Sequence, residues 1–76
     1  MRRKFNYING DVEIDFSYPK YFQRYIDDME AYDANDDYPR YNSVCEPFVY
    51  TICKNCYASG VLTKEQYEKF QRRYLL

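Results

Sequence analysis

The sequence has 76 residues, a formal net charge of −1, three cysteines and no histidine. This length allows one domain, residues 1–76, near the lower limit at which a hydrophobic core suffices without disulfides or metals. Aliphatic residues are few, so eleven Tyr and five Phe must supply much of the core. Neither a signal peptide nor an apolar run of about 18 residues is found, so we expect a cytoplasmic protein with reduced thiols.

Residues 3–16 are predicted to form a β-hairpin around Asn9-Gly10, a pair typical of two-residue type I′ turns. One face of this hairpin would be apolar and the other polar, as a half-buried hairpin requires. The predicted cross-strand pairs are Tyr7 with Val12, Phe5 with Ile14, Lys4 with Asp15, and Asn6 with Glu13.

The next segment is predicted to form a helix that begins near Pro19, with Ser17 or Tyr18 as its cap. We expect it to end near Ala34, before the break formed by Asn35-Asp36-Asp37 and Pro39. Apolar side chains recur along it at helical spacing. They are Tyr18, Phe22, Tyr25, Ile26 and Met29, with Tyr32 at the edge of the stripe.

A second helix is predicted to begin between Tyr38 and Pro47 and to end before Gly60. Its start is left open, because Ser43 and Glu46 match a capping box whereas Pro47 fits the first turn of a later start. A helix that is apolar on two sides is either central or presents one side to a partner, and in so small a domain we expect the central position. The main stripe is Tyr41, Val44, Cys45, Phe48 and Ile52, and the opposite stripe is Tyr50, Cys53 and Tyr57.

A third helix is predicted after Gly60, which we expect to end the second helix in a left-handed conformation. Thr63 and Gln66 match a capping box at its start. Its apolar face would consist of Tyr67, Phe70 and Tyr74. Together the elements predict an α+β fold, an N-terminal β-hairpin followed by three helices (ββααα).

Catalysis is not expected from these residues. Without histidine, neither a Ser-His nor a Cys-His pair can form. Gly10 and Gly60 are assigned to a turn and a helix end, which leaves no glycine for a phosphate-binding loop. The carboxylate pairs Asp27-Asp28 and Asp36-Asp37 are expected in solvent, whereas a general acid needs a desolvated carboxyl group. We therefore expect no enzymatic activity and no cofactor.

The three cysteines are predicted to be structural. Cys53 and Cys56 have the spacing of half a zinc site or of a redox pair, but zinc requires four ligands. Cys45 lies about 16 Å from Cys56 along a continuous helix that rises about 1.5 Å per residue. We expect Cys45 and Cys56 to be small core residues, Cys53 to be partly exposed, and no metal to bind.

Charge is unevenly distributed along the chain. Residues 1–10 carry three bases and no acid, residues 11–46 carry ten acids and three bases, and residues 47–76 carry five bases and two acids. Spaced carboxylates can imitate a row of phosphates toward a basic groove, and tyrosines add contact area at low entropic cost. A solvated helix face that runs into a polar loop is the alternative explanation. The expected partner-binding residues are Asp27, Asp28, Glu30, Tyr32, Asp33, Asp36, Asp37, Tyr38 and Tyr41.

Two other surfaces come into consideration. The stripe of Tyr50, Cys53 and Tyr57 is an alternative interface, through which a structural or regulatory adaptor would form homo-oligomers. The basic clusters at residues 2–4 and 72–73 suggest nucleic acid, but direct binders usually have a clear basic excess, which this chain lacks. We therefore expect a protein partner rather than a nucleic acid or a membrane.

The chain shows two resemblances. Residues 57–76 contain Gly60-Val61-Leu62-Thr63, continue with an acidic and aromatic turn, and close on basic residues and leucines; they resemble the SHOCT-type C-terminal helical hairpin. The whole chain is similar to small accessory proteins of bacteriophages and mobile elements, being short and tyrosine-rich with an acidic centre. Anti-CRISPR and other anti-defence inhibitors of that kind commonly occupy a nucleic-acid groove. This likeness implies an inhibitor that binds a basic nucleoprotein such as a CRISPR effector.

Overall fold

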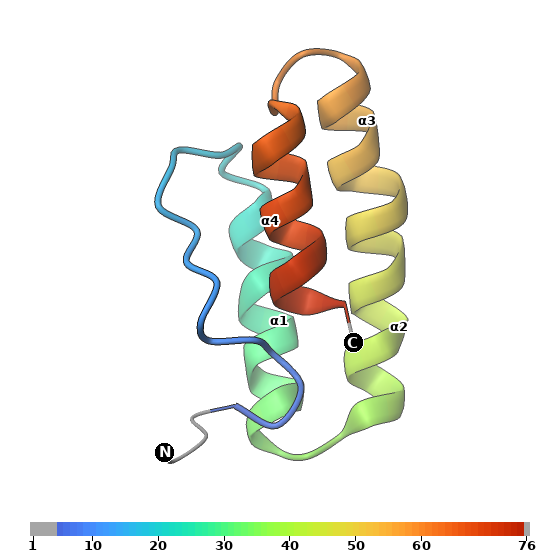
Figure 1. Cartoon of the computed structure of the whole chain (residues 1–76). Coiled ribbons are helices and arrows are strands. Elements are labelled where there is room, and N and C mark those ends of the chain that lie inside the picture. Colours follow the sequence, from blue (N-terminus) through green and yellow to red (C-terminus); the bar gives the residue numbers. More distant parts are fainter. Residues whose placement is uncertain (1–4, 76) are drawn as a thin grey trace.

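The computed structural model describes residues 5–75, in which three helical units lie side by side and no strand occurs (Figure 1). The elements in chain order are α1 Phe22–Ala34, α2 Tyr38–Pro47, the π-helical segment η1 Phe48–Cys53, α3 Lys54–Ala58 and α4 Lys64–Tyr74. Because α2, η1 and α3 follow one another without a break, we call them together the rod. Residues 5–20 run along the side of the bundle and are called the strap (Figure 1).

The prediction of an α+β fold with an N-terminal β-hairpin is wrong, because the strap contains no strand within the described residues. Asn9 begins a turn in which the Val12 N–H donates to the Asn9 carbonyl at 3.2 Å. The predicted type I′ turn would need a positive φ at both Asn9 and Gly10, and neither residue has one. The strap backbone bonds to distant helices instead, and the Asn9 N–H donates to the Arg73 carbonyl at 2.7 Å.

Helix α1 begins at Phe22, later than predicted. Residues 19–22 form a separate turn, in which the Pro19 carbonyl accepts the Phe22 N–H at 3.0 Å. The predicted end at Ala34 is confirmed. Asp36 follows with a left-handed φ of 54° and closes the helix in a Schellman motif. The centre of the predicted apolar stripe is also confirmed, since Phe22, Ile26 and Met29 are buried. Three other members are half-buried: Tyr18, Tyr25 and Tyr32.

Helix α2 begins at Tyr38, the earliest of the predicted starts. Asp37 caps it through its side chain, and Pro39 occupies the first turn, where a missing N–H breaks no hydrogen bond. Pro39, which was expected to help break the first helix, therefore lies in the first turn of the second. The capping box of Ser43 and Glu46 is not used, because both residues lie inside α2.

Pro47 lies inside the rod and is followed at once by η1. It has no N–H and its ring crowds the carbonyl of the preceding turn, so the α-helical ladder is interrupted there. A π-helical turn encloses one residue more than an α-helical turn, which rotates the side chains that follow. As a result Cys53 is fully buried and Ile52 is half-buried. The prediction that Cys53 is partly exposed and shares a face with Tyr50 and Tyr57 is therefore wrong.

The core is centred on one phenylalanine from each helical unit. The ring centroids are 5.1 Å apart for Phe22 and Phe48, 5.4 Å for Phe22 and Phe70, and 5.7 Å for Phe48 and Phe70. All three pairs are edge-to-face, the arrangement that aromatic quadrupoles favour. The rod contributes a single buried face to this core, made of Tyr41, Cys45, Phe48, Val49, Cys53 and Cys56.

Helix α4 starts as predicted. The Gln66 N–H donates to Thr63 Oγ1 at 3.2 Å, and the Thr63 N–H donates to Gln66 Oε1 at 3.0 Å, so the capping box is confirmed. The expected apolar face is confirmed for Phe70 and Tyr74, which are buried, while Tyr67 is half-buried.

Gly60 ends the rod with a φ of 84°, as predicted. No atom lies within 4 Å of an added Cβ there, so Gly60→Ala is expected to cost only backbone strain, about 1 kcal/mol of unfolding free energy. Gly10→Ala is the control, because Gly10 has no positive φ and we expect a change within about 0.5 kcal/mol. Urea denaturation measures both. A larger loss for Gly10→Ala than for Gly60→Ala would favour the hairpin turn over the strap.

Candidate functional site

The nine predicted partner-binding residues fall into three groups in the structure. Asp33 and Tyr41 are each 1 % exposed, so they are not available for contact with a partner. The others are at least partly accessible, and some of them bond to neighbouring residues. Asp36 and Asp37 lie at the junction of α1 and α2, next to Tyr32 and Tyr38, whereas Asp27, Asp28 and Glu30 lie along α1.

The buried Asp33 carboxylate anchors the strap. Its Oδ1 accepts the Asn6 N–H at 3.0 Å, and its Oδ2 accepts the N–H groups of Tyr7 at 2.6 Å and Ile8 at 3.0 Å. The Asn6 side chain also donates to the Asp33 carbonyl at 2.6 Å. In the predicted hairpin the N–H groups of Asn6 and Ile8 would have bonded to the partner strand, whereas here they bond to Asp33. Asp33 therefore organises the fold and is not available as a surface charge.

Tyr41 has a similar internal role. Its hydroxyl donates to the Tyr74 carbonyl at 2.6 Å, and the Cys45 thiol donates to the same carbonyl at 3.1 Å. Tyr74 is the last residue of α4, so its carbonyl has no partner within the helix. Burial raises the pKa of the Tyr41 hydroxyl and raises that of the Cys45 thiol to about 11, which keeps both groups protonated as donors.

Tyr7 connects the strap to the end of α1. Its hydroxyl donates to Asp36 Oδ1, and its ring packs edge-to-face on Tyr38, with centroids 5.3 Å apart. The hydrogen bond to the Asp36 carboxylate is the main reason that the pKa of Tyr7 is raised to about 12. Asp37 is also engaged, because it caps α2 and lies 3.6 Å from Arg40 Nε.

The contribution of Tyr7 to stability is expected to be lost as pH rises from about 10 to about 12. Its folded pKa exceeds the ordinary value of 10.0, so the folded chain holds this proton more tightly than the unfolded chain. The stabilisation is complete below the unfolded pKa and disappears through the folded one. Urea unfolding of the wild type and Tyr7→Phe should therefore give free energies that converge over this range. A difference that stays constant would contradict the Tyr7–Asp36 bond.

The exposed carboxylates of α1 form the most acidic accessible helix surface. Asp27, Asp28 and Glu30 are all exposed, and Asp27 accepts a hydrogen bond from Gln23 Nε2 at 2.8 Å. Within residues 5–75 none of these three carboxylates forms an ion pair. No cation in the described part of the chain therefore pairs with them. We call these three residues, together with Asp36 and Tyr38, the acidic surface.

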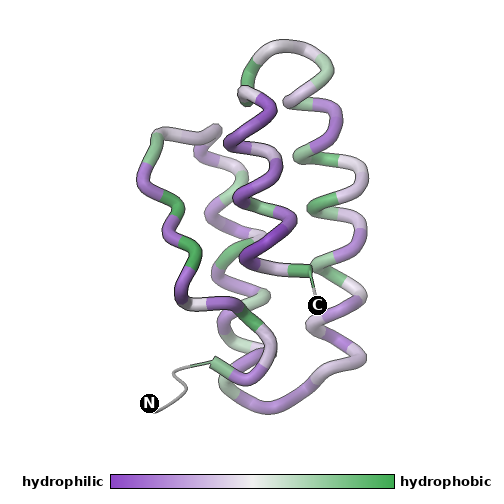
Figure 2. The backbone as a smooth tube through the Cα atoms, in the orientation of Figure 1, coloured by the Kyte–Doolittle hydropathy of each residue, from purple (hydrophilic) through white to green (hydrophobic). Residues whose placement is uncertain are grey.

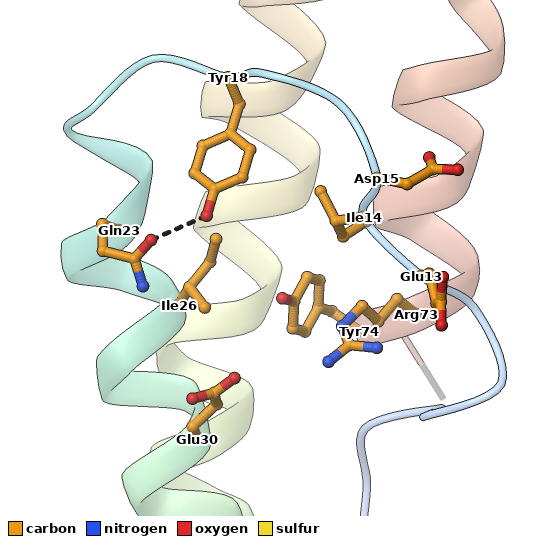
Figure 3. Close-up of a pocket in the computed structure, with 9 residues that line it drawn as sticks. All are labelled: Glu13, Ile14, Asp15, Tyr18, Gln23, Ile26, Glu30, Arg73 and Tyr74. Atoms are coloured by element: carbon orange, nitrogen blue, oxygen red, sulfur yellow. Dashed lines mark hydrogen bonds between the residues drawn. The ribbon is translucent and has the colours of Figure 1, made fainter.

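A hollow of about 350 Å³ lies between α1 and the strap (Figure 3). In Figure 3 Glu30 stands on the α1 side, while Glu13 and Asp15 come from the strap. These two strap carboxylates were not predicted as site residues, because the expected hairpin paired Glu13 with Asn6 and Asp15 with Lys4. The alternation of acids at residues 11, 13 and 15 was the signal that could have found them. The complete lining is Glu13, Ile14, Asp15, Tyr18, Gln23, Ile26, Glu30, Arg73 and Tyr74.

Two cations of α4 hold the strap beside the hollow. Arg73 Nη1 donates to the Val12 carbonyl at 2.6 Å, and the guanidinium lies over the Phe5 ring, 5.6 Å from its centroid. Lys69 Nζ lies 2.9 Å from Asp15 Oδ1, which lowers the pKa of Asp15. Lys4, the predicted partner of Asp15, lies outside the described residues. Glu13 and Glu30 form no ion pair with any residue between 5 and 75.

All three cysteines are buried free thiols, which confirms the predicted core positions of Cys45 and Cys56. Burial raises the pKa of Cys53, and Cys56 Sγ lies 3.2 Å from the Tyr21 hydroxyl. Among residues 5–75, no three His, Cys, Asp or Glu side chains are grouped in a way that could hold a metal ion.

Burial of Cys53 reduces the predicted alternative interface to its tyrosines. Tyr50 is 52 % exposed and Tyr57 is 40 % exposed. The Tyr57 ring stacks on Tyr67 with centroids 5.4 Å apart, and Val61 beyond it is 55 % exposed. We call Tyr50, Tyr57 and Val61 the tyrosine patch. Of the basic clusters, residues 2–4 lie outside the described part of the chain, and Arg73 is engaged with the strap.

No helix in the described part of the chain is both long and apolar enough to span a membrane. The chain matches no protein-family model, no curated protein and no solved structure.

Proposed function

We propose that the chain is a non-catalytic inhibitor that binds a basic, nucleic-acid-binding surface of a host defence nucleoprotein, in the manner of anti-CRISPR proteins. The observation that carries the proposal is the absence of ion pairs, within residues 5–75, at Asp27, Asp28 and Glu30 on the exposed side of α1. A surface that binds phosphates attracts such carboxylates and is occupied by them. The inhibitor would act in the bacterial cytoplasm, where its thiols stay reduced.

Two of the expected contact residues, Asp33 and Tyr41, are too buried to touch a partner. The proposed contacts are those of the acidic surface, while the buried Asp33 and Tyr41 support it by fixing the strap and α4. Tyr38, which is 41 % exposed and braced by the Tyr7 ring, supplies a rigid aromatic contact beside the carboxylates. Its bracing lowers the conformational entropy lost on binding.

The experiment is a pull-down from bacterial lysate that contains CRISPR effectors, with and without nuclease, read by mass spectrometry. The test variant reverses Asp27, Asp28 and Glu30 to Lys. The matched control reverses three exposed acids elsewhere, Glu46, Glu65 and Glu68. Circular dichroism checks that both variants remain folded.

We expect the chain to retain a nucleoprotein after nuclease treatment and to release it at raised salt, because exposed charges are screened. The control should retain the nucleoprotein, the test variant should lose it, and inhibition of the purified effector should follow the same order. Equal binding by the two variants, or loss of binding on nuclease treatment, would contradict the proposal.

A second candidate function is self-association through the tyrosine patch, as a structural or regulatory adaptor. It is favoured by the exposure of Tyr50 in η1, Tyr57 in α3 and Val61 in the loop that follows. Tyrosines of this kind are enriched at interfaces. Sedimentation should then show a mass that rises with concentration and falls for Tyr50→Glu. A monomer mass that is independent of concentration would dismiss this candidate.

A further inference from the structure

The second half of the strap has the features of a strand without a neighbour. Glu13, Asp15 and Ser17 are exposed, whereas the residues between them are half-buried, and Figure 2 shows the matching alternation of hydropathy. Alternation of this kind is the period of an extended strand. Within residues 5–75, the backbone of residues 13–18 makes no hydrogen bond to another backbone group. Such a segment is a template for pairing with another chain.

The hollow lies beside this segment and offers room for incoming side chains. It is bounded by residues 13–15 of the strap on one side and by α1 on the other (Figure 3). Ile14, Ile26 and Tyr74 give it an apolar lining, and its volume of about 350 Å³ exceeds that of a single water molecule many times over. A side chain with an apolar stem therefore fits there.

The charge of the hollow selects a cationic side chain. Three carboxylates and one guanidinium line it, and Lys69 pairs with one of the carboxylates, so negative charge exceeds positive charge by one. Asp15 is paired with Lys69, but Glu13 and Glu30 have no cationic partner among the described residues. An arginine or lysine combines an apolar stem with a charged end, so it matches both the lining and the carboxylates.

We propose that residues 13–16 bind an extended basic segment of a partner protein, which adds to the strap as a strand and places an arginine or lysine beside Glu30. In this mode of recognition the main-chain hydrogen bonds give affinity and the pockets for alternate side chains give specificity. The inference rests on the proposed function, because it names the part of the basic partner that the chain binds.

The test uses the full ¹⁵N-labelled chain and a synthetic peptide of alternating arginine and valine. Two control peptides carry either N-methyl groups on alternate residues, which remove backbone donors, or glutamate in place of arginine. We expect amide shifts at residues 13–16 and in α1 near Glu30. N-methylation should weaken binding about tenfold or more, and the glutamate peptide should not bind. Glu30→Lys should weaken binding similarly, whereas Glu68→Lys, an exposed acid of α4, should not.

The outcomes separate this inference from the proposed function. Equal binding of the N-methylated peptide, or shifts that map away from the strap, would overturn strand addition while leaving charge-driven binding in place. Shifts at residues 13–16 that appear on concentrating the chain alone would assign the edge to a second copy and overturn the basic partner. Strand addition observed together with unchanged nucleoprotein binding by the triple lysine variant would instead overturn the proposed function.

Discussion

Replacing Asp33 with alanine is expected to remove much of the stability of the chain. The substitution leaves the N–H groups of Asn6, Tyr7 and Ile8 without the carboxylate that accepts them at 2.6 to 3.0 Å. Hydrogen bonds to charged groups contribute about 1.5–3 kcal/mol each, and they are only partly additive. We expect a loss of about 3 kcal/mol or more from the total of about 4–11 kcal/mol typical of a chain of this length.

Urea denaturation of Asp33→Ala beside Asp28→Ala measures this effect. Asp28 lies on the same helix but is exposed, so its removal should change the unfolding free energy by less than about 0.5 kcal/mol. Asp33→Asn should be intermediate, because its amide retains one oxygen but turns an N–H₂ group toward the backbone donors. Similar values for Asp33→Ala and Asp28→Ala would show that the strap is not anchored by this carboxylate.

Phe48→Ala is expected to be as damaging, with a loss of about 3–5 kcal/mol. Phe48 is 0 % exposed and joins the rod to both other helical units, through edge-to-face contacts with Phe22 and Phe70. It also stacks on Tyr25, with centroids 5.4 Å apart. Its removal would leave a cavity at the point where all three units meet.

The control for Phe48→Ala is Tyr50→Ala, in the same π-helical segment but 52 % exposed, for which we expect a loss of about 1 kcal/mol or less. Phe48→Leu keeps a measurable fold if the alanine variant is unfolded, and its loss should fall between the two. An equal loss of unfolding free energy for Tyr50→Ala and Phe48→Ala would show that the Tyr50 side of η1 faces the core. That result would contradict the structure.

The features that could be predicted from the sequence are those set by neighbouring residues. The end of α1, the left-handed Gly60 and the Thr63–Gln66 capping box all depend on contacts within a few positions, and all three are confirmed. The prediction of a hairpin was wrong because it rested on the neighbouring residues Asn9 and Gly10. The groups that bind this backbone lie far along the chain, in α1 and α4. Asp33 is 27 residues from Asn6, and no local pattern reports such a contact.

The candidate site could also be predicted only in part. The charge pattern predicted the acidic residues of α1 as partner contacts, and it did not distinguish the buried Asp33 from the exposed Asp28. Helical spacing separates them, because Asp33 lies four positions after the buried Met29 and so on the core face. The burial of Cys53 could not be predicted from α-helical spacing, because η1 changes the period of the rod after Pro47.

The hollow, the Asp33 anchor and the proposed strand addition all require the strap to lie along α1 and α4. The most direct measurement is a set of NOEs on the isotope-labelled chain. We predict NOEs from Ile8 and Val12 to α1 and α4, together with strongly shifted amide protons at Asn6, Tyr7 and Ile8. Cross-strand NOEs between Tyr7 and Val12 and between Asn6 and Glu13 would instead establish a hairpin and rule out the strap.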